Sequence, residues 1–182
     1  MKNKDETKQV KKVMRIFFVW SENKEAEWLN KMSREGWHLK NVSVFFYVFE
    51  KGEPENFVYQ FDFRLGSSKD EEEYLEIFRS AGWELVNQFG AWYYFRKPWR
   101  EGEQNRIYSD RESLKKKYMK ILFFLFIVGF PLFINLFVFQ DRGGLSRFYS
   151  WFWPVYTFFL VLWLFAVIRI FIYMKRVTRK PE

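Results

Sequence analysis

An unbroken apolar run from Met119 to Phe139 constrains this chain more than any other feature. Within it, only Lys120, Pro131 and Asn135 depart from a composition of apolar and aromatic side chains and one glycine. About twenty such residues in a helix cross the roughly 30 Å hydrocarbon core of a bilayer. A second run covers residues 151–173. The sequence therefore predicts a transmembrane hairpin with helices at 119–139 and 151–173, joined by an extracytoplasmic loop at 140–150.

The net charge of +8 belongs to the flanks of these two runs. Residues 1–110 carry 18 Lys and Arg against 19 Asp and Glu, whereas residues 111–182 carry 12 against 3. Because Lys and Arg concentrate on the cytoplasmic side of membrane helices, this distribution places both termini in the cytoplasm. The region before the hairpin has no basic excess, so nucleic acid is not an expected partner.

The same rule predicts which residues meet the membrane interface. Lysines and arginines flank the runs on the cytoplasmic side, and tryptophans are typical of the outer interface. An arginine inside a run but near the inner surface can extend its guanidinium group toward water. These interface residues are Lys115, Lys116, Lys117, Lys120, Trp151, Trp153, Arg169, Lys175 and Arg176. Residues 174–182 form a basic cytoplasmic tail, and the lipid bilayer is an expected partner.

An internal repeat organises the part of the chain before the hairpin. With a shift of 46 positions, residues 25–41 (EAEWLNKMSREGWHLKN) align with residues 71–87 (EEEYLEIFRSAGWELVN). Such self-similarity indicates two copies of one supersecondary unit. The coincident pairs include Glu25 with Glu71, Gly36 with Gly82, Trp37 with Trp83, Asn41 with Asn87 and Tyr47 with Tyr93.

Each copy has the pattern strand, helix, strand, strand. Strands are expected at 13–20, 37–42, 44–50, 57–64, 83–88 and 91–96, and helices at 22–34 and 69–80, from period-two and helical spacing of the apolar residues. Ser68 with Glu71 is typical of a capping box. The predicted fold is α+β: two βαββ repeats form a two-layer sandwich with an antiparallel-rich sheet, followed by the transmembrane hairpin. The domain spans 13–98, after a flexible tail at 1–12 and before a polar, basic connector at 99–118.

Residues suited to catalysis or to metal binding are scarce. The chain has no cysteine, which excludes disulfides and thiolate chemistry, and a single histidine, His38. The acidic residues at 70–73 are consecutive, so they suit the first turn of a helix better than a converging site. We therefore predict a protein that is not an enzyme, with no catalytic residue, cofactor or metal site.

The aromatic residues of the paired strands favour binding instead. Residues 44–49 (VFFYVF) and 91–95 (AWYYF) are apolar on both strand faces, and only one face can pack under the helices. The candidates for covering the other face are loops and the connector, a protein partner or second copy, the membrane surface, or a small apolar ligand. The aromatic residues expected on that exposed face form the candidate interaction surface: Phe46, Tyr47, Trp92 and Tyr94.

The GW-x-L turns at 36–39 and 82–85 and the closing YYFRK at 93–97 resemble the bacterial family called domain of unknown function 2812. The resemblance covers about residues 13–97 and implies no catalytic residues. Similar members often carry C-terminal membrane spans and are often encoded beside a PadR-like transcriptional regulator. The resemblance thus implies a membrane-linked regulatory role in the bacterial cytoplasmic membrane.

Together, these features predict a membrane-anchored cytoplasmic binding or regulatory module that acts through protein contacts or self-association. One alternative is a membrane-linked sensor of lipophilic or membrane-active compounds. A second is a small accessory subunit of a larger membrane complex.

Overall fold

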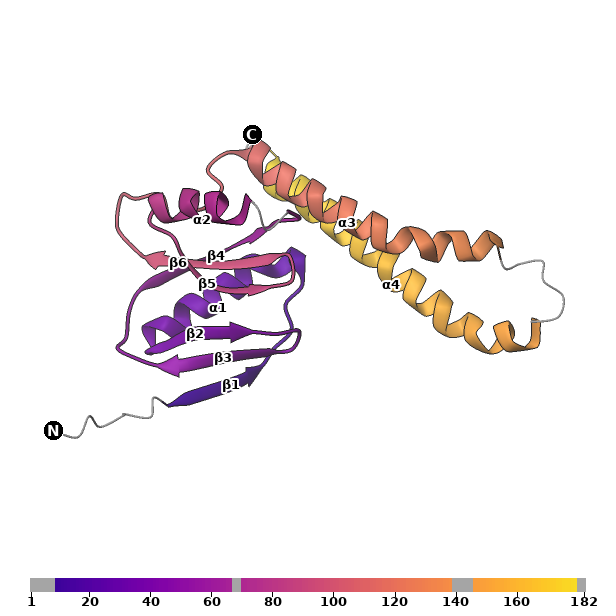
Figure 1. Cartoon of the computed structure of the whole chain (residues 1–182), viewed down its shortest axis with the longest axis horizontal. Coiled ribbons are helices and arrows are strands. Elements are labelled where there is room, and N and C mark those ends of the chain that lie inside the picture. The colour runs from indigo at the N-terminus through magenta and orange to yellow at the C-terminus, as the bar shows by residue number, and fades with distance from the viewer. Residues whose placement is uncertain (1–8, 67–69, 139–145, 180–182) are drawn as a thin grey trace. The chain divides into compact units, whose positions relative to one another are not determined.

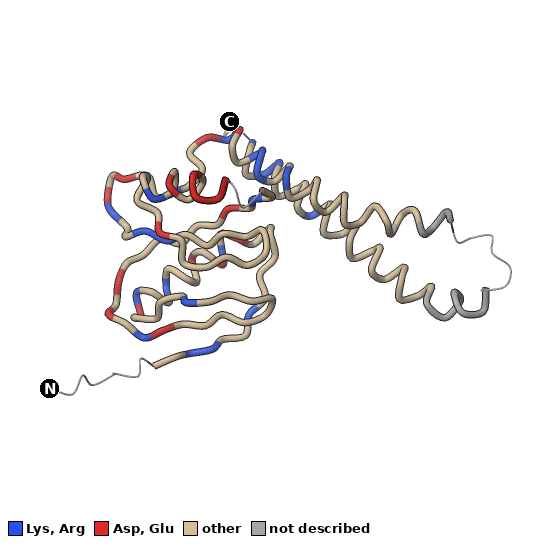
Figure 2. Tube along the Cα trace, in the orientation of Figure 1, with Lys and Arg blue, Asp and Glu red and all other residues tan. Residues whose placement is uncertain are grey.

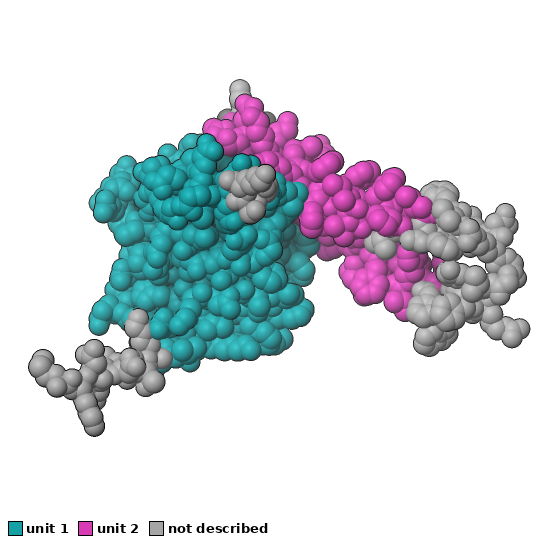
Figure 3. All heavy atoms as spheres, in the orientation of Figure 1, with its two compact units in different colours: residues 1–109 teal, residues 110–182 magenta. Residues whose placement is uncertain are grey.

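The computed structural model describes residues 9–66, 70–138 and 146–179, with the backbone alone for residues 132, 135–138 and 146–152. The chain divides into two compact units, residues 1–109 and residues 110–182 (Figure 3). Most of the predicted tail and the Ser68 cap lie outside the described residues. The first unit holds all the strands, and the second unit holds the two long helices.

The first half of the first unit contains β1 (Val10–Met14), a short 3₁₀ turn η1 (Val19–Ser21), α1 (Glu22–Arg34), β2 (Trp37–Val42) and β3 (Phe46–Lys51). The strands form an antiparallel sheet in the order β1-β3-β2. The second half contains β4 (Phe57–Phe63), α2 (Glu71–Ser80), β5 (Glu84–Phe89) and β6 (Trp92–Pro98), with the strand order β4-β6-β5 (Figure 1). The α+β class is confirmed, but the strands form two three-stranded sheets rather than the one sheet expected.

Helix α1 lies in the core between the two sheets. Its buried apolar residues Ala26, Leu29 and Met32 recur at helical spacing, so they form one stripe along the helix. This stripe packs against buried residues of both sheets, among them Phe49 of β3 and Tyr59 of β4. The helix ends before Gly36, whose φ of 77° suits a residue without a Cβ atom.

Polar side chains form hydrogen bonds with backbone N–H groups at the sheet edges that face this core. The Tyr59 backbone N–H on the edge strand β4 donates to Asn30 Oδ1 of α1 at 2.8 Å. The Tyr59 hydroxyl accepts from the Leu39 backbone N–H of β2 at 3.4 Å. Because unpaired backbone groups are costly when buried, these bonds allow two open sheets to share one core.

The facing edges of the two sheets, β2 and β5, lie next to each other. Asn87 Oδ1 accepts from the Val42 backbone N–H at 3.2 Å, and Asn87 Nδ2 donates to Asn41 Oδ1 at 2.9 Å. Both strands have a register shift at this place, between Leu39 and Asn41 in β2 and between Leu85 and Asn87 in β5. The side chains of Asn41 and Asn87 therefore join the edges of β2 and β5, which are not paired by backbone hydrogen bonds.

The second sheet has a second apolar layer on its other face. Val58, Trp83, Tyr93 and Phe95 are buried there, and residues of α2 pack against them. The Phe78 ring stacks on Phe95, with ring centroids 4.2 Å apart and planes 5° from parallel. Packing on both faces explains why six of the seven β4 residues are buried.

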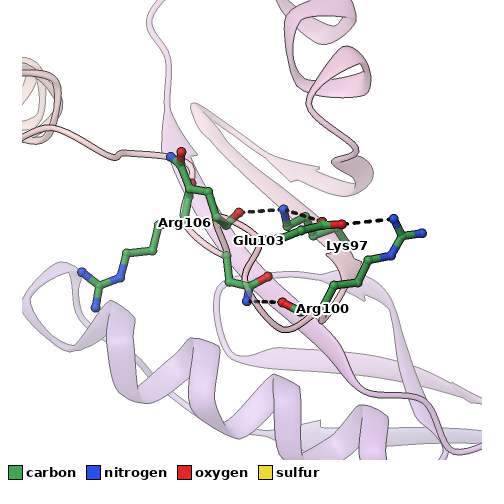
Figure 4. Close-up of polar contacts among 6 residues, drawn as sticks. Lys97, Arg100, Glu103 and Arg106 are labelled. Carbon is green, nitrogen blue, oxygen red and sulfur yellow. Dashed lines mark hydrogen bonds and ion pairs between the residues drawn. The ribbon is translucent and has the colours of Figure 1, made fainter.

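The first ten residues of the predicted connector fold back onto this unit. Lys97 is buried, and its Nζ donates to the Gln104 carbonyl at 2.6 Å and lies 3.7 Å from Glu103 (Figure 4). The same ammonium lies over the Trp83 ring, 5.2 Å from the ring centroid. The connector assignment is therefore wrong for this segment, because the interactions of Lys97 anchor it without any apolar period in the sequence.

The N-terminal strand also differs from its prediction at 13–20. β1 covers Val10–Met14 and pairs with β3, so it begins inside the predicted tail. Its lysines cover rings of neighbouring strands, with Lys12 Nζ 4.1 Å from the Phe46 ring centroid. The 3₁₀ turn replaces the end of the predicted strand, since Ser21 Oγ accepts from the Phe18 N–H and donates to the Phe18 carbonyl.

The second unit consists of α3 (Arg111–Val138) and α4 (Ser146–Thr178). Figure 2 shows the Lys and Arg residues gathered near the start of α3 and an uncharged stretch after them. Among the described residues, one segment, Trp153–Thr178, is long and apolar enough to cross a membrane by length and composition, and only 6% of its most apolar window is buried. Such exposure is unlike a core helix of a soluble protein, so this helix indicates membrane association.

The two helices contact each other through a tryptophan and a glycine. The Trp163 indole lies against Gly129, where an added Cβ atom would overlap it. Trp163 Nε1–H donates to the Leu125 carbonyl at 2.9 Å, and the Phe133 ring packs edge-on to the indole. α3 continues through Pro131, whereas the Asn135 side chain lies outside the described residues.

Candidate functional site

A pocket of about 160 Å³ opens in the first unit beside the start of α1. Its walls come from the segment before α1, the first turn of α1, the β2–β3 turn and the face of the second sheet that is turned toward α1. We call it the Glu25 pocket. The described residues that line it are Phe17, Phe18, Val19, Glu22, Glu25, Val42, Ser43, Val44, Tyr47, Phe61, Phe89, Trp92 and Tyr94.

The central polar group of the pocket is the Glu25 carboxylate. Glu25 lies in the first turn of α1 on the buried side of the helix and is only 7% exposed. The Tyr47 hydroxyl donates to Glu25 Oε1 at 2.6 Å. A buried carboxylate is costly unless donors or cations satisfy it, and the Tyr47 hydroxyl is one such donor for Glu25.

Two tyrosines share the environment of this carboxylate. Burial, followed by the negative charge of Glu25, raises the pKa of Tyr47. The same two causes in the same order raise the pKa of Tyr94. Both phenols therefore stay protonated at neutral pH and remain able to donate hydrogen bonds.

Aromatic rings form most of the remaining wall. Phe61 and Tyr94 come from neighbouring strands, and their ring centroids are 4.8 Å apart. Phe17 meets Tyr47 edge-on at 6.0 Å. Trp28 stands behind Tyr47, with its ring perpendicular and the centroids 5.0 Å apart. These contacts fix the ring orientations, so core packing holds the aromatic part of the wall.

The ionisable carboxyl groups among the described lining residues are not matched by a basic lining residue. Of the described residues that line it, Glu22 and Glu25 are acidic and none is basic. The nearby guanidinium of Arg15 lies over the Trp28 ring at 4.6 Å and the Phe17 ring at 5.8 Å. The lining thus combines carboxylates with electron-rich ring faces.

A second buried carboxylate, Asp62, lies on the opposite face of the second sheet. The hydroxyls of Tyr74 and Tyr108 and the Phe63 backbone N–H all donate to it. Burial and then the charge of Asp62 raise the pKa of both tyrosines. Protein donors satisfy this carboxylate, so the cluster holds the sheet, α2 and the loop before α3 together.

Glu71 makes a third tyrosine contact, and it is the counterpart of Glu25 at a distance of 46 residues. The Tyr93 hydroxyl donates to Glu71 Oε1 at 3.0 Å, as Tyr47 does to Glu25. Glu71 is half-buried and does not line the pocket. The same residue pair therefore occurs twice in the unit, once facing a pocket and once away from it.

The four residues predicted as an exposed aromatic surface lie elsewhere than expected. Tyr47 and Tyr94 are buried, at 4% and 8% exposure, and Phe46 and Trp92 are half-buried. The exposed-face assignment is wrong for the two tyrosines, because α1 covers the strand face that carries them. Tyr47, Trp92 and Tyr94 instead meet in the Glu25 pocket, whereas Phe46 contacts Lys12.

Glu25 matches Glu71 in the internal repeat, but the match alone does not show that Glu25 lines a pocket. Two signals could have located the pocket. Glu25 precedes Leu29 by four residues and so lies on the apolar stripe of α1. In addition, the glutamates recur together with the tyrosines that contact them, Tyr47 and Tyr93, at the same distance of 46 residues.

The other predicted residues divide between exposed and buried positions. Lys115, Lys116, Lys120, Arg169, Lys175 and Arg176 are exposed, as is Trp153, and the Trp151 side chain lies outside the described residues. Lys117 is buried, with 3% of its surface exposed, so the expectation of an exposed side chain at the membrane interface is wrong for this residue. The helical period explains this, because Lys117 lies one turn from the buried Ile121.

His38 is half-buried. Its Nε2 lies 2.8 Å from the Glu53 carbonyl, and its ring meets Phe57 edge-on. Among the described residues, no group of three or more His, Cys, Asp or Glu side chains is placed to hold a metal ion.

The fold and the pocket define a small α+β domain with an acidic, aromatic-lined pocket, followed by an apolar helix that can cross a membrane. The chain belongs to the family described as protein of unknown function (DUF2812), whose model matches residues 21–130. The match begins at the last residue of η1 and continues into α3, beyond the segment expected from the GW-x-L turns. Comparison with curated proteins and with solved structures gave no match.

Proposed function

We propose that this chain is a membrane-anchored regulatory module whose first unit binds a small organic ligand in the Glu25 pocket. The observation that carries the proposal is the buried Glu25 carboxylate in a wall of packed aromatic rings. Concave, mostly apolar sites with a few convergent polar groups are the usual form of small-ligand sites. This interpretation favours a sensor of lipophilic or membrane-active compounds, one of the functions considered from the sequence.

The proposed anchor is a two-span hairpin in a bacterial cytoplasmic membrane, with both termini in the cytoplasm. Two observations support it. Trp153–Thr178 can cross a bilayer, and α3 carries exposed apolar side chains such as Phe123, Ile127 and Phe130 over the predicted first span. A single cysteine in this cysteine-free chain would map the topology. On intact cells, a membrane-impermeant maleimide should label Ser146→Cys and should leave Ser113→Cys unlabelled; the reverse pattern would contradict the orientation.

We also propose that the two halves of the first unit are copies of one βαββ element. The equivalent strand orders, the register shifts 46 residues apart and the two Glu–Tyr contacts support this. The left-handed glycines Gly36 and Gly82 support it as well. Only the first copy contributes its glutamate to the pocket, so the copies differ in role.

A second candidate function is binding to a protein partner or to another copy of the chain, including service as an accessory subunit. Exposed apolar side chains near the pocket favour it: Met14, Ile16, Phe18, Val44 and Phe45. The change of Val44 and Phe45 to serine would test this candidate. Loss of a higher oligomer or of a co-purified protein would support it, and unchanged mass in solution would contradict it.

Ligand binding can be tested with the full chain in a neutral detergent. Trp92 lines the pocket, so its fluorescence should respond when a compound enters. A panel of small neutral, cationic and anionic organic compounds is titrated into the wild type and into Trp92→Phe. A saturable change that disappears in the variant supports the proposal, whereas no saturable change with any compound class would contradict it.

A further inference from the structure

The lining of the Glu25 pocket is selective in its chemistry. Seven of the described lining residues are aromatic: Phe17, Phe18, Tyr47, Phe61, Phe89, Trp92 and Tyr94. Two more, Glu22 and Glu25, are acidic, and no lysine, arginine or histidine is among the described lining residues. Every charged group in this wall therefore has the same sign.

Each class of ligand would experience this wall differently. An anion would be repelled by two carboxylates, one of them 7% exposed. A neutral apolar compound would gain only from contact with the rings. An organic cation would gain from the carboxylate and from the ring faces, because cation–π attraction strengthens when the cation is desolvated.

Inorganic cations fit the wall poorly. Calcium takes six to eight oxygen ligands, and magnesium requires a nearly ideal octahedron of oxygens. The described residues place no group of three or more acidic or histidine side chains for a metal. Aromatic rings, in contrast, are the surroundings that proteins use to recognise quaternary ammonium groups.

The dimensions of the pocket limit the ligand further. Its volume of about 160 Å³ is close to that of a cavity that holds benzene, roughly 150 Å³, and below the roughly 300 Å³ of the smallest drug-sized pockets. The pocket therefore has room for a compact head group and not for a large molecule. Phe18 and Val44, which are 56% and 60% exposed, line the opening and offer apolar surface to the remainder of a longer ligand.

We propose that the Glu25 pocket binds a compact organic ammonium group, either as a small cation or as the head group of a cationic amphiphile. The Glu25 carboxylate holds the charge, Tyr47 orients the carboxylate, and the aromatic rings enclose the substituents on nitrogen. This inference rests on the proposed function and names its ligand class. It also suits a membrane sensor, since cationic amphiphiles concentrate at anionic bilayer surfaces.

The test compares two ligands of the same shape, choline and its uncharged isostere 3,3-dimethylbutan-1-ol. Each is titrated into the full chain in a neutral detergent, with sodium chloride adjusted so that ionic strength stays constant. Trp92 fluorescence and isothermal titration calorimetry report binding. We expect choline to bind at least about tenfold more tightly than the alcohol, the factor that corresponds to about 1.4 kcal/mol.

Two matched variants test whether the Glu25 carboxylate is the charge that favours choline. Glu25→Gln keeps an oxygen that can accept from Tyr47 and removes the charge, and it should abolish the preference for choline. Glu71→Gln makes the same change at the equivalent Tyr93 contact, outside the pocket, and should leave the preference intact. Because both variants remove one negative charge, a difference between them cannot come from net charge.

The outcomes separate the inference from the proposed function. Equal affinities for choline and the alcohol, or equal losses in Glu25→Gln and Glu71→Gln, would overturn the ammonium inference and leave the pocket as a neutral ligand site. No binding of either compound, together with no response to the wider panel, would overturn both. The isostere comparison uses the wild type, so it decides the matter even if Glu25→Gln does not fold.

Discussion

Replacement of Asn87 by alanine removes two hydrogen bonds that join the facing edges of the two sheets. One is accepted from the Val42 backbone N–H, and the other is donated to Asn41 Oδ1. Val42 is 5% exposed and also lines the Glu25 pocket. Its N–H is at the edge of β2 that no strand ladder pairs, so alanine at position 87 removes the acceptor of that group.

The loss of stability depends on whether each lost hydrogen bond leaves a buried polar group without a partner. A buried donor without its acceptor costs about 1–3 kcal/mol, and a hydrogen bond with both partners near solvent contributes about 0.5–1.5 kcal/mol. Asn87→Ala should therefore destabilise the first unit by about 1.5–4.5 kcal/mol. Asn41→Ala loses only the bond between the two side chains and should cost about 0.5–1.5 kcal/mol.

Urea unfolding of the full chain in a neutral detergent, followed by tryptophan fluorescence, measures both variants and the double variant. We expect Asn87→Ala to lower the transition midpoint clearly more than Asn41→Ala, with unchanged slope, because the slope reports the surface exposed on unfolding. The double variant should show a coupling energy of about 0.5–1.5 kcal/mol, since the two side chains are in contact. Equal costs for the two single variants, or no coupling, would refute the role given to this contact.

Further predictions concern the rest of the chain. Gly129→Leu should lower the thermal stability of the helical pair more than Gly129→Ala, because the Trp163 indole occupies the space beside Gly129; equal stability of both variants would contradict this contact. Lys97→Met should make the segment after β6 more sensitive to limited proteolysis, whereas Glu103→Gln should have little effect because Glu103 is largely exposed. The unfolding free energy should fall steeply above pH 10, by up to about 1.4 kcal/mol per pH unit for each phenol with a raised pKa, because the unfolded chain ionises first and the stability is lost as pH rises toward the folded pKa. The part of the tyrosinate absorbance that is lost when Tyr47, Tyr74, Tyr94 or Tyr108 is changed to phenylalanine should then rise only with unfolding; a rise of that part before unfolding would contradict burial of the tyrosine concerned.

Local patterns in the sequence were sufficient for the helix and strands with a clear period. α1 covers Glu22–Arg34 and β2 covers Trp37–Val42, as predicted, because their apolar spacing and the glycine after α1 act within a few residues. The α+β class and the family membership were predicted in the same way. These features depend on neighbours in sequence.

Features that depend on tertiary contacts could not be predicted. β1 forms because the lysine-rich segment pairs with β3, although it has little alternation of its own. The strands divide into two sheets because α1 is placed between them and Asn30 satisfies an edge of β4. The segment after β6 belongs to the first unit because Lys97 binds the Gln104 carbonyl.

The residues of the candidate interaction surface could be selected from the sequence, but the exposure of the two tyrosines among them could not. Tyr47, Trp92 and Tyr94 were selected as aromatic residues that need a partner, and they line one pocket. The apolar pattern of β3 and β6 could not show which strand face α1 would cover, so the two tyrosines were assigned to the surface. Glu25 could not be identified as a pocket residue from the sequence, because an acidic residue in a first helical turn is ordinarily explained by the helix dipole.

Protection of a single thiol at the pocket opening is the most direct test that the pocket binds a ligand. The chain has no cysteine, and the exposed Ser43 lines the Glu25 pocket, so Ser43→Cys provides one reporter there. Ser80→Cys, on the exposed end of α2, is the control. The labelling rate with a maleimide is measured for each full-length variant across a titration of choline. Our account predicts a saturable decrease in the rate for Ser43→Cys and an unchanged rate for Ser80→Cys, whereas unchanged rates for both, or equal decreases in both, would contradict binding of the ammonium ligand in the pocket.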